Sequence, residues 1–269
     1  MKKYSLEILP KQVSNIGKLN TDFFADVYIT HIPGSSLDDL VSAASTILDA
    51  GFNPIPHIPA RSFPSANVLK NTLTTLKRIG VKDLLTIGGS IQSPEGPYDS
   101  TISMYRSGVF DQLEFEQLRI AGHPEGNPDD STPLKSLEGK LTWLRDNAIS
   151  TAIVTQFCFS HEITNRWISH IKNILEKLFI TDVEIHIGVA GPAKITTLIK
   201  YAKLCGVSAS AEFLKKQGLD LAKVVKLSPS KIIDQLNGHD QIHFFPFGGL
   251  EEVSSWISEQ ISSTEGAEL

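Results

Sequence analysis

The chain has 269 residues and a formal net charge of −5, and 41% of its residues are hydrophobic while 20% are charged. This average composition excludes a disordered, collagen-like or coiled-coil chain, and the mild acidity argues against a nucleic-acid partner. The sequence holds no long apolar window and no signal-peptide pattern, so we expect a cytoplasmic protein without a membrane partner. Cys158 and Cys205 form no C-x-x-C pair, so no zinc or redox motif is expected.

Eight short, mostly apolar runs recur along the chain and predict buried parallel strands. They cover Tyr4–Ile8, Asp26–Ile32, Asn53–Pro59, Asp83–Gly88, Gln117–Ala121, Thr151–Phe157, Asp182–Val189 and Gln241–Phe247. Amphipathic segments between them predict helices, several of which begin after a Ser and end at a Gly. These segments cover Leu37–Gly51, Ser65–Gly80, Ser136–Ala148, His161–Leu178, Pro192–Gly206 and Gly249–Ile261.

The alternation of strands and helices predicts the fold. Eight strands, mostly each followed by a helix, in about 250 residues indicate an α/β protein with the (β/α)8 TIM-barrel fold. We expect one catalytic domain that covers residues 1–269. A doubly wound sheet is the rival, but the first strand ends in Pro10 where such a sheet usually carries a Gly-rich fingerprint.

Polar residues at the strand ends are the candidate functional residues, because the active sites of such barrels lie there. Glu7 stands inside the first apolar run, where it either faces solvent or a buried cation, or forms a carboxyl with a raised pKa that acts as an acid. Gln156 ends the sixth run with an amide that needs a protein or ligand partner. Histidines near strand ends suggest a metal only weakly, and no metal is expected. These histidines are His31, His57, His186 and His243.

Five motifs follow one another along nearly the whole chain. They are YSLEILPK (Tyr4–Lys11), PHIPAR (Pro56–Arg61), AGHPEGNPD (Ala121–Asp129), VTQFCFS (Val154–Ser160) and HFFPF (His243–Phe247). In their order and spacing these motifs resemble the methylenetetrahydrofolate reductase family. The Thr-Gln-Phe motif is the most specific of them.

The resemblance implies a barrel that binds FAD and interconverts 5,10-methylenetetrahydrofolate and 5-methyltetrahydrofolate, with NAD(P)H as the electron donor. It places the chain in one-carbon metabolism and methionine biosynthesis, with a small-molecule folate substrate, and leaves a homo-oligomer open. Glu7 matches the family's general acid, which protonates a ring nitrogen of the folate, and the flavin carries the hydride. Gln156 matches a pterin-binding residue, and Ser90 stands at a substrate position. The resemblance assigns to the cofactor Thr30, His57, Gly89, Tyr98, His123, Asn127, Glu138 and Arg145.

Departures from the family's pattern keep other functions open. The family's Arg-Gly-Asp after the fourth strand is Gly88-Gly89-Ser90 here, so a hydroxyl stands where a carboxylate would tune the flavin. His123 stands where the family has a tyrosine. These changes suit a folate-binding relative without catalysis, a relative with little flavin, or one that works in the oxidising direction during demethylation of methylated compounds. Glycines near the last two strands also suit a barrel enzyme acting on a phosphorylated metabolite, or are ordinary turn residues. They are Gly188, Gly191, Gly248 and Gly249.

Overall fold

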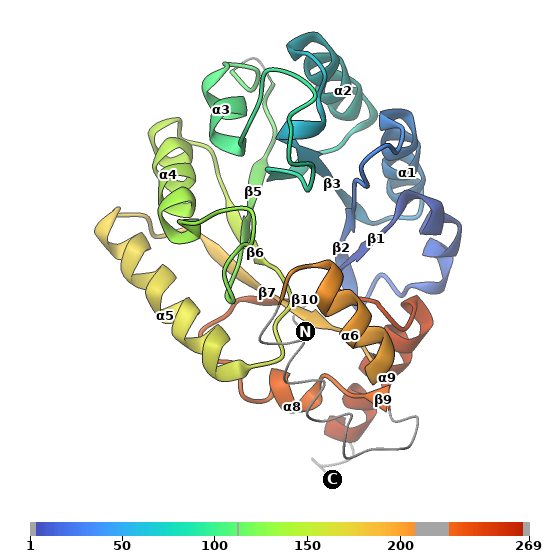
Figure 1. Ribbon diagram of the computed structural model, residues 1–269. Coiled ribbons are helices and arrows are strands. Elements are labelled where there is room, and N and C mark those ends of the chain that lie inside the picture. Colours follow the sequence, from blue (N-terminus) through green and yellow to red (C-terminus); the bar gives the residue numbers. More distant parts are fainter. Residues whose placement is uncertain (1–3, 112, 208–225, 266–269) are drawn as a thin grey trace.

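Eight parallel strands form a closed barrel in the order β1-β10-β7-β6-β5-β4-β3-β2 (Figure 1). The computed structural model describes residues 4–111, 113–207 and 226–265. The predicted barrel is therefore confirmed. Its strands are β1 (Tyr4–Ile8), β2 (Phe24–Ile29), β3 (Asn53–Pro59), β4 (Asp83–Ile87), β5 (Gln117–Gly122), β6 (Ala152–Thr155), β7 (Glu184–Ala190) and β10 (Gln241–Phe245).

Helices surround the barrel and bury their apolar faces against the strands (Figure 1). Two of them begin at predicted N-caps, where the hydroxyl of Ser36 accepts a bond from the backbone N–H of Asp38, and that of Ser65 from Val68. The helices are α1 (Leu37–Asp49), α2 (Ala66–Ile79), α3 (Thr101–Arg106), α4 (Pro133–Asp146), α5 (His161–Lys177), α6 (Ile195–Leu204), α8 (Ser230–Ile233) and α9 (Leu250–Glu265), with the 3-10 helices η1 (Pro10–Lys18) and η2 (Ala60–Ser62). In the described ranges, no helix combines the length and apolar character needed to cross a membrane.

The first residues of two helices differ from the prediction by three positions. Helix α4 begins one turn earlier, at Pro133, because proline is preorganised for the first turn and has no N–H to leave unpaired. The segment predicted as helical from Pro192 first forms β8 (Ala193–Lys194), which pairs antiparallel with β9 (Lys226–Leu227). Helix α6 therefore begins only at Ile195. Helices η1, η2, α3 and α8 had no counterpart in the prediction.

Paired polar side chains fill the barrel interior toward the amino ends of the strands. Arg119 of β5 lies 2.7 Å from Asp26 and 3.2 Å from Asp83, and it donates to the Tyr28 hydroxyl at 2.6 Å. The Asn53 amide donates to both carboxylates, at 2.9 and 2.8 Å. We call these five residues the Arg119 network. Each buried carboxylate accepts bonds from two donors, which offsets the cost of removing it from water.

Candidate functional site

Glu7 lies inside the barrel on β1, where it meets two histidines. Its Oε2 is 3.9 Å from Nε2 of His57 and 3.8 Å from Nε2 of His243. Only 19% of its side chain is exposed, and burial raises its pKa to about 7, an effect that nearby His57 opposes. Among the described residues, no lysine or arginine pairs with Glu7. At neutral pH this carboxyl is therefore partly protonated and can act as an acid.

Burial also keeps both neighbouring histidines uncharged. It lowers the pKa of His57 to about 4 and that of His243 to about 3. The Nδ1 of His243 lies 3.0 Å from the Ser5 hydroxyl, and its ring meets the Tyr28 ring edge-on at 4.5 Å between centroids. We call Ser5, Glu7, His57 and His243 the Glu7 cluster. Its acid is therefore flanked by neutral imidazoles and not by permanent cations.

Thr30 and Gln156 follow the ends of β2 and β6. The backbone N–H and hydroxyl of Thr30 both donate to the carbonyl of Ile8, at 2.9 and 3.0 Å, which ties β2 to the end of β1 beyond Glu7. The Oε1 of Gln156 accepts from the backbone N–H of Phe157 at 3.0 Å. This bond fixes the orientation of the amide, with its oxygen turned toward the backbone.

Four buried polar atoms near the ends of β2, β3 and β4 have no hydrogen-bond partner among the described residues. They are Nδ1 of His31, Nε2 of His57, Nε of Arg61 and the hydroxyl of Tyr98. His57 is 8% exposed and Tyr98 only 3%. Buried polar groups in folded proteins are nearly always hydrogen-bonded. Orphaned groups gathered at the carboxyl ends of barrel strands therefore indicate a place for a ligand.

Arg61 of η2 connects β3 to the loop between β4 and α3. Its backbone N–H donates to the carbonyl of Gly88 at 3.0 Å, its carbonyl accepts from the backbone of Glu95 at 2.9 Å, and its guanidinium donates to the carbonyl of Gly89. Ser90 is exposed on the same loop. Arg61 was not among the predicted site residues, although its place at the end of the Pro-His motif was a usable signal.

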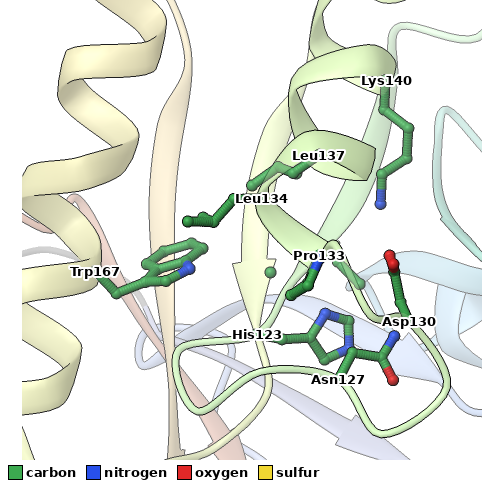
Figure 2. Close-up of a pocket in the computed structure, with 10 residues that line it drawn as sticks. His123, Asn127, Asp130, Pro133, Leu134, Leu137, Lys140 and Trp167 are labelled. Atoms are coloured by element: carbon green, nitrogen blue, oxygen red, sulfur yellow. The ribbon is translucent and has the colours of Figure 1, made fainter.

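A pocket lies between the β5–α4 loop, the first turns of α4 and Trp167 of α5 (Figure 2). The predicted residues His123 and Asn127 meet here. Lys140 extends back along α4 toward Asp130, and burial lowers its pKa to about 8, an effect that Asp130 opposes. Burial, followed by the charge of Lys140, lowers the pKa of His123 to about 4. The pocket is thus lined by an ammonium that faces a carboxylate, by a neutral imidazole and by an amide.

Two predicted cofactor residues lie away from this pocket. Arg145 stands in the last turn of α4 and donates to Asp146 and to the carbonyl of Leu178. Barrel helices run antiparallel to their strands, so this turn lies at the face where the strands begin. Glu138 is exposed on α4. The cation of α4 that faces the pocket is Lys140, which the sequence prediction missed.

Two glycines near the last strands are explained by packing. A Cβ on Gly188 would lie 2.3 Å from the carbonyl oxygen of Thr155, and one on Gly248 would lie 2.0 Å from that of Pro192. Contacts this close exclude every larger residue. The fold therefore requires these glycines whether or not a phosphate binds. Within the described ranges, no group of three or more His, Cys, Asp or Glu residues is placed to hold a metal ion.

These observations define the class of the protein, a closed (β/α)8 barrel with polar side chains at the strand ends, and solved structures share its barrel fold. No family model matches the chain. A Clostridium thermocellum protein that binds two copies of 5-methyl-5,6,7,8-tetrahydrofolic acid is 10% identical, with a TM-score of 0.58 over 95% of this chain and 92% of that one. A 2,3-dimethylmalate lyase of the PEP mutase/isocitrate lyase superfamily is 11% identical, with a TM-score of 0.52 over 100% and 84%. At these identities the likeness shows the barrel fold alone.

Proposed function

We propose that the protein is a flavin-dependent oxidoreductase that interconverts 5,10-methylenetetrahydrofolate and 5-methyltetrahydrofolate, with NAD(P)H as the electron donor. One observation carries this proposal. Glu7 is a buried carboxyl at the carboxyl ends of the barrel strands, and burial raises its pKa to about 7. A carboxyl of this kind is suited to protonating a weakly basic ring nitrogen near neutral pH.

A folate fits the same end of the barrel. The amide of Gln156 can recognise the donor and acceptor edge of a pterin, and its orientation is already fixed by Phe157. A barrel of similar fold binds 5-methyltetrahydrofolate, which supports a folate as the ligand class here. The motifs around Glu7 and Gln156 give further support through their resemblance to the folate reductases.

The residues present also fit FAD. His57 and Tyr98 carry buried polar atoms without partners among the described residues, which the polar edge of a flavin ring would satisfy. His123, Asn127 and Lys140 line a pocket with a cationic group for the phosphate-bearing part. Bound FAD would supply the hydride chemistry.

The roles of the protein's own groups follow from their protonation states. Glu7 is partly protonated at neutral pH, and its protonated form donates to the folate ring nitrogen, which opens the five-membered ring. His57 and His243 stay neutral beside it, so they add no full charge that would hold the carboxyl ionised. Gln156 orients the pterin.

Purified protein tests this proposal directly. We expect a yellow protein with the absorbance of bound flavin, and NAD(P)H should bleach it. Glu7→Gln should abolish folate turnover while flavin reduction by NAD(P)H continues, because only the folate step needs the acid. Glu259→Gln, an exposed glutamate on α9, is the matched control. Folate turnover that survives in Glu7→Gln would remove the assigned acid, and a colourless protein that binds folate without turnover would favour the non-catalytic alternative.

Lys140 provides a test of the cofactor site alone. Removing a cation that contacts phosphate costs on the order of 1.5–3 kcal/mol, so Lys140→Met should weaken FAD binding roughly 10- to 100-fold. Riboflavin lacks the phosphates, and its binding should not change. Lys135→Met, an exposed lysine on the same helix, is the control. Equal FAD affinities for the two variants would place the phosphates elsewhere.

A further inference from the structure

We propose that His243, held by Ser5, is a positioning residue that fixes which oxygen of the Glu7 carboxyl carries the acid proton. The proposal rests on the proposed function for the use of that proton. The arrangement of the carboxyl does not depend on the proposed function, because the ligand-free protein already has this arrangement. His243 was noted in the sequence only as one of four histidines near strand ends.

Both histidines of the Glu7 cluster approach the same carboxyl oxygen. Nε2 of His243 lies 3.8 Å and Nε2 of His57 lies 3.9 Å from Oε2 of Glu7. Oε1 receives no hydrogen bond from any described residue. Oε2 is therefore the oxygen of this carboxyl that lies closest to the two imidazoles, at distances just beyond a hydrogen bond.

Ser5 decides how His243 presents its nitrogen. In a neutral imidazole, the bond made by one ring nitrogen sets whether the other carries the proton. In the proposed arrangement the Ser5 hydroxyl donates to Nδ1, 3.0 Å away, and the proton of His243 stands on Nε2, facing Oε2. A donor beside Oε2 favours a lone pair on that oxygen, so the carboxyl proton is held on Oε1. A small rotation of the carboxyl would close the separation of 3.8 Å to a hydrogen bond in the ligand-free protein.

The ring of His243 has little freedom to leave this position. It is 1% exposed, and it packs edge-on against the rings of Tyr28 and Phe245, with centroids 4.5 and 5.2 Å away. Charged and titratable groups also face the cluster from neighbouring elements. These groups are His186 of β7, Arg119 of β5 and Asp26 of β2 toward His243, and His57 of β3 and Cys205 after α6 toward Glu7. The first two lower the pKa of His243, which keeps it neutral and able to present one N–H.

The test is a titration of Glu7 by carboxyl-carbon NMR in the ligand-free, full-length protein, with Glu7→Gln to assign the signal. His243→Leu removes the donor to the carboxylate, and we expect the pKa of Glu7 to rise by about one. His243→Gln can place an amide N–H where Nε2 stood, so its pKa should stay near the wild-type value. His170→Leu is the control, because this histidine is exposed on α5 and lies outside the Glu7 cluster.

Turnover of 5,10-methylenetetrahydrofolate with NAD(P)H gives the second measurement. We expect kcat to fall about 10- to 100-fold in His243→Leu with KM unchanged, and to recover in His243→Gln. An unchanged pKa of Glu7 in His243→Leu, or equal losses in the Leu and Gln variants, would overturn the proposal. Should the Leu variant fail to fold, His243→Asn replaces it, because its shorter amide stops before Glu7. If even the wild-type protein does not turn folate over, the proposed function fails while the titration still decides the role of His243.

Discussion

The barrel interior has two polar regions that differ in how their groups are satisfied. Toward the amino ends of the strands, the Arg119 network pairs both carboxylates and the Tyr28 hydroxyl with donors at 2.6–3.2 Å. At the carboxyl ends, Oε2 of Glu7 lies 3.8 and 3.9 Å from the nearest nitrogens of His243 and His57, and buried atoms of His57 and Tyr98 have no hydrogen-bond partner among the described residues.

This difference separates structural groups from groups that await a ligand. A buried charge that already has its hydrogen bonds contributes to the folded state and has little left for chemistry. A buried group with loose or missing bonds keeps a shifted pKa and an unused donor, which are the properties of a binding or catalytic site. In the otherwise paired Arg119 network, Nε of Arg119 is buried and has no hydrogen-bond partner among the described residues.

The largest expected effect comes from breaking the paired region. Arg119→Leu leaves two buried carboxylates without their cation, and we expect the free energy of unfolding to fall by about 3–5 kcal/mol. Urea denaturation measures this loss. Arg145→Leu removes an exposed arginine paired with Asp146 and should cost only a small fraction of it. Similar losses in both variants would contradict a structural role for the network.

The next largest effect is the pH dependence of stability that Glu7 contributes. Glu7 keeps its proton to a pKa of about 7, whereas the unfolded chain releases it near 4.5, so the folded state binds more protons between these values. Stability contributed by Glu7 is therefore present below pH 4.5 and is lost as the pH rises to about 7. Glu7→Gln does not titrate, and we expect it to gain on the order of 3 kcal/mol relative to wild type across this window.

Unfolding of wild type and Glu7→Gln at both ends of the window checks this gain. His57 and His243 act in the opposite direction, because their lowered pKa values make stability fall as the pH drops below 6.5 toward 4 and 3. Both proteins contain these histidines, so the difference between them isolates Glu7. A difference that does not change with pH would mean that the folded carboxyl titrates normally.

The smallest effect compares two tyrosines. Tyr28→Phe leaves a donor of Arg119 without its acceptor, which should cost about 1–3 kcal/mol. Tyr98→Phe removes a hydroxyl that has no described partner, so the ligand-free protein should lose nothing. Thermal unfolding of the two variants measures the contrast, and an equal loss would show that Tyr98 already has a partner.

Local sequence predicted the barrel because each strand is an apolar run whose pattern depends on its own few residues. The Arg119 network could not be predicted in this way. Arg119 lies 93 positions from Asp26 and 36 from Asp83 along the chain, and only the closure of the barrel brings them together. The short strands β8 and β9 depend on distant pairing for the same reason.

The candidate site was predictable where a motif marks a strand end, as at Glu7, His57 and Gln156. The choice between Arg145 and Lys140 was also within reach of the sequence. A barrel helix that ends near residue 146 carries its last turn to the face away from the site, so the earlier lysine is the one that can reach it. The Ser5–His243 contact joins residues 238 positions apart and needed the three-dimensional structure.

The packing of Trp167 gives the protein an optical signal of its own. A Cβ on Gly122 would lie 2.6 Å from the Trp167 ring, so this glycine seats the indole against β5, where it forms one wall of the pocket in Figure 2. Trp143 is stacked on Tyr105, and Trp256 bonds to serine hydroxyls, so both belong to other surroundings. The fluorescence of Trp167 should therefore change when a ligand binds in this pocket, so binding can be measured without an attached dye.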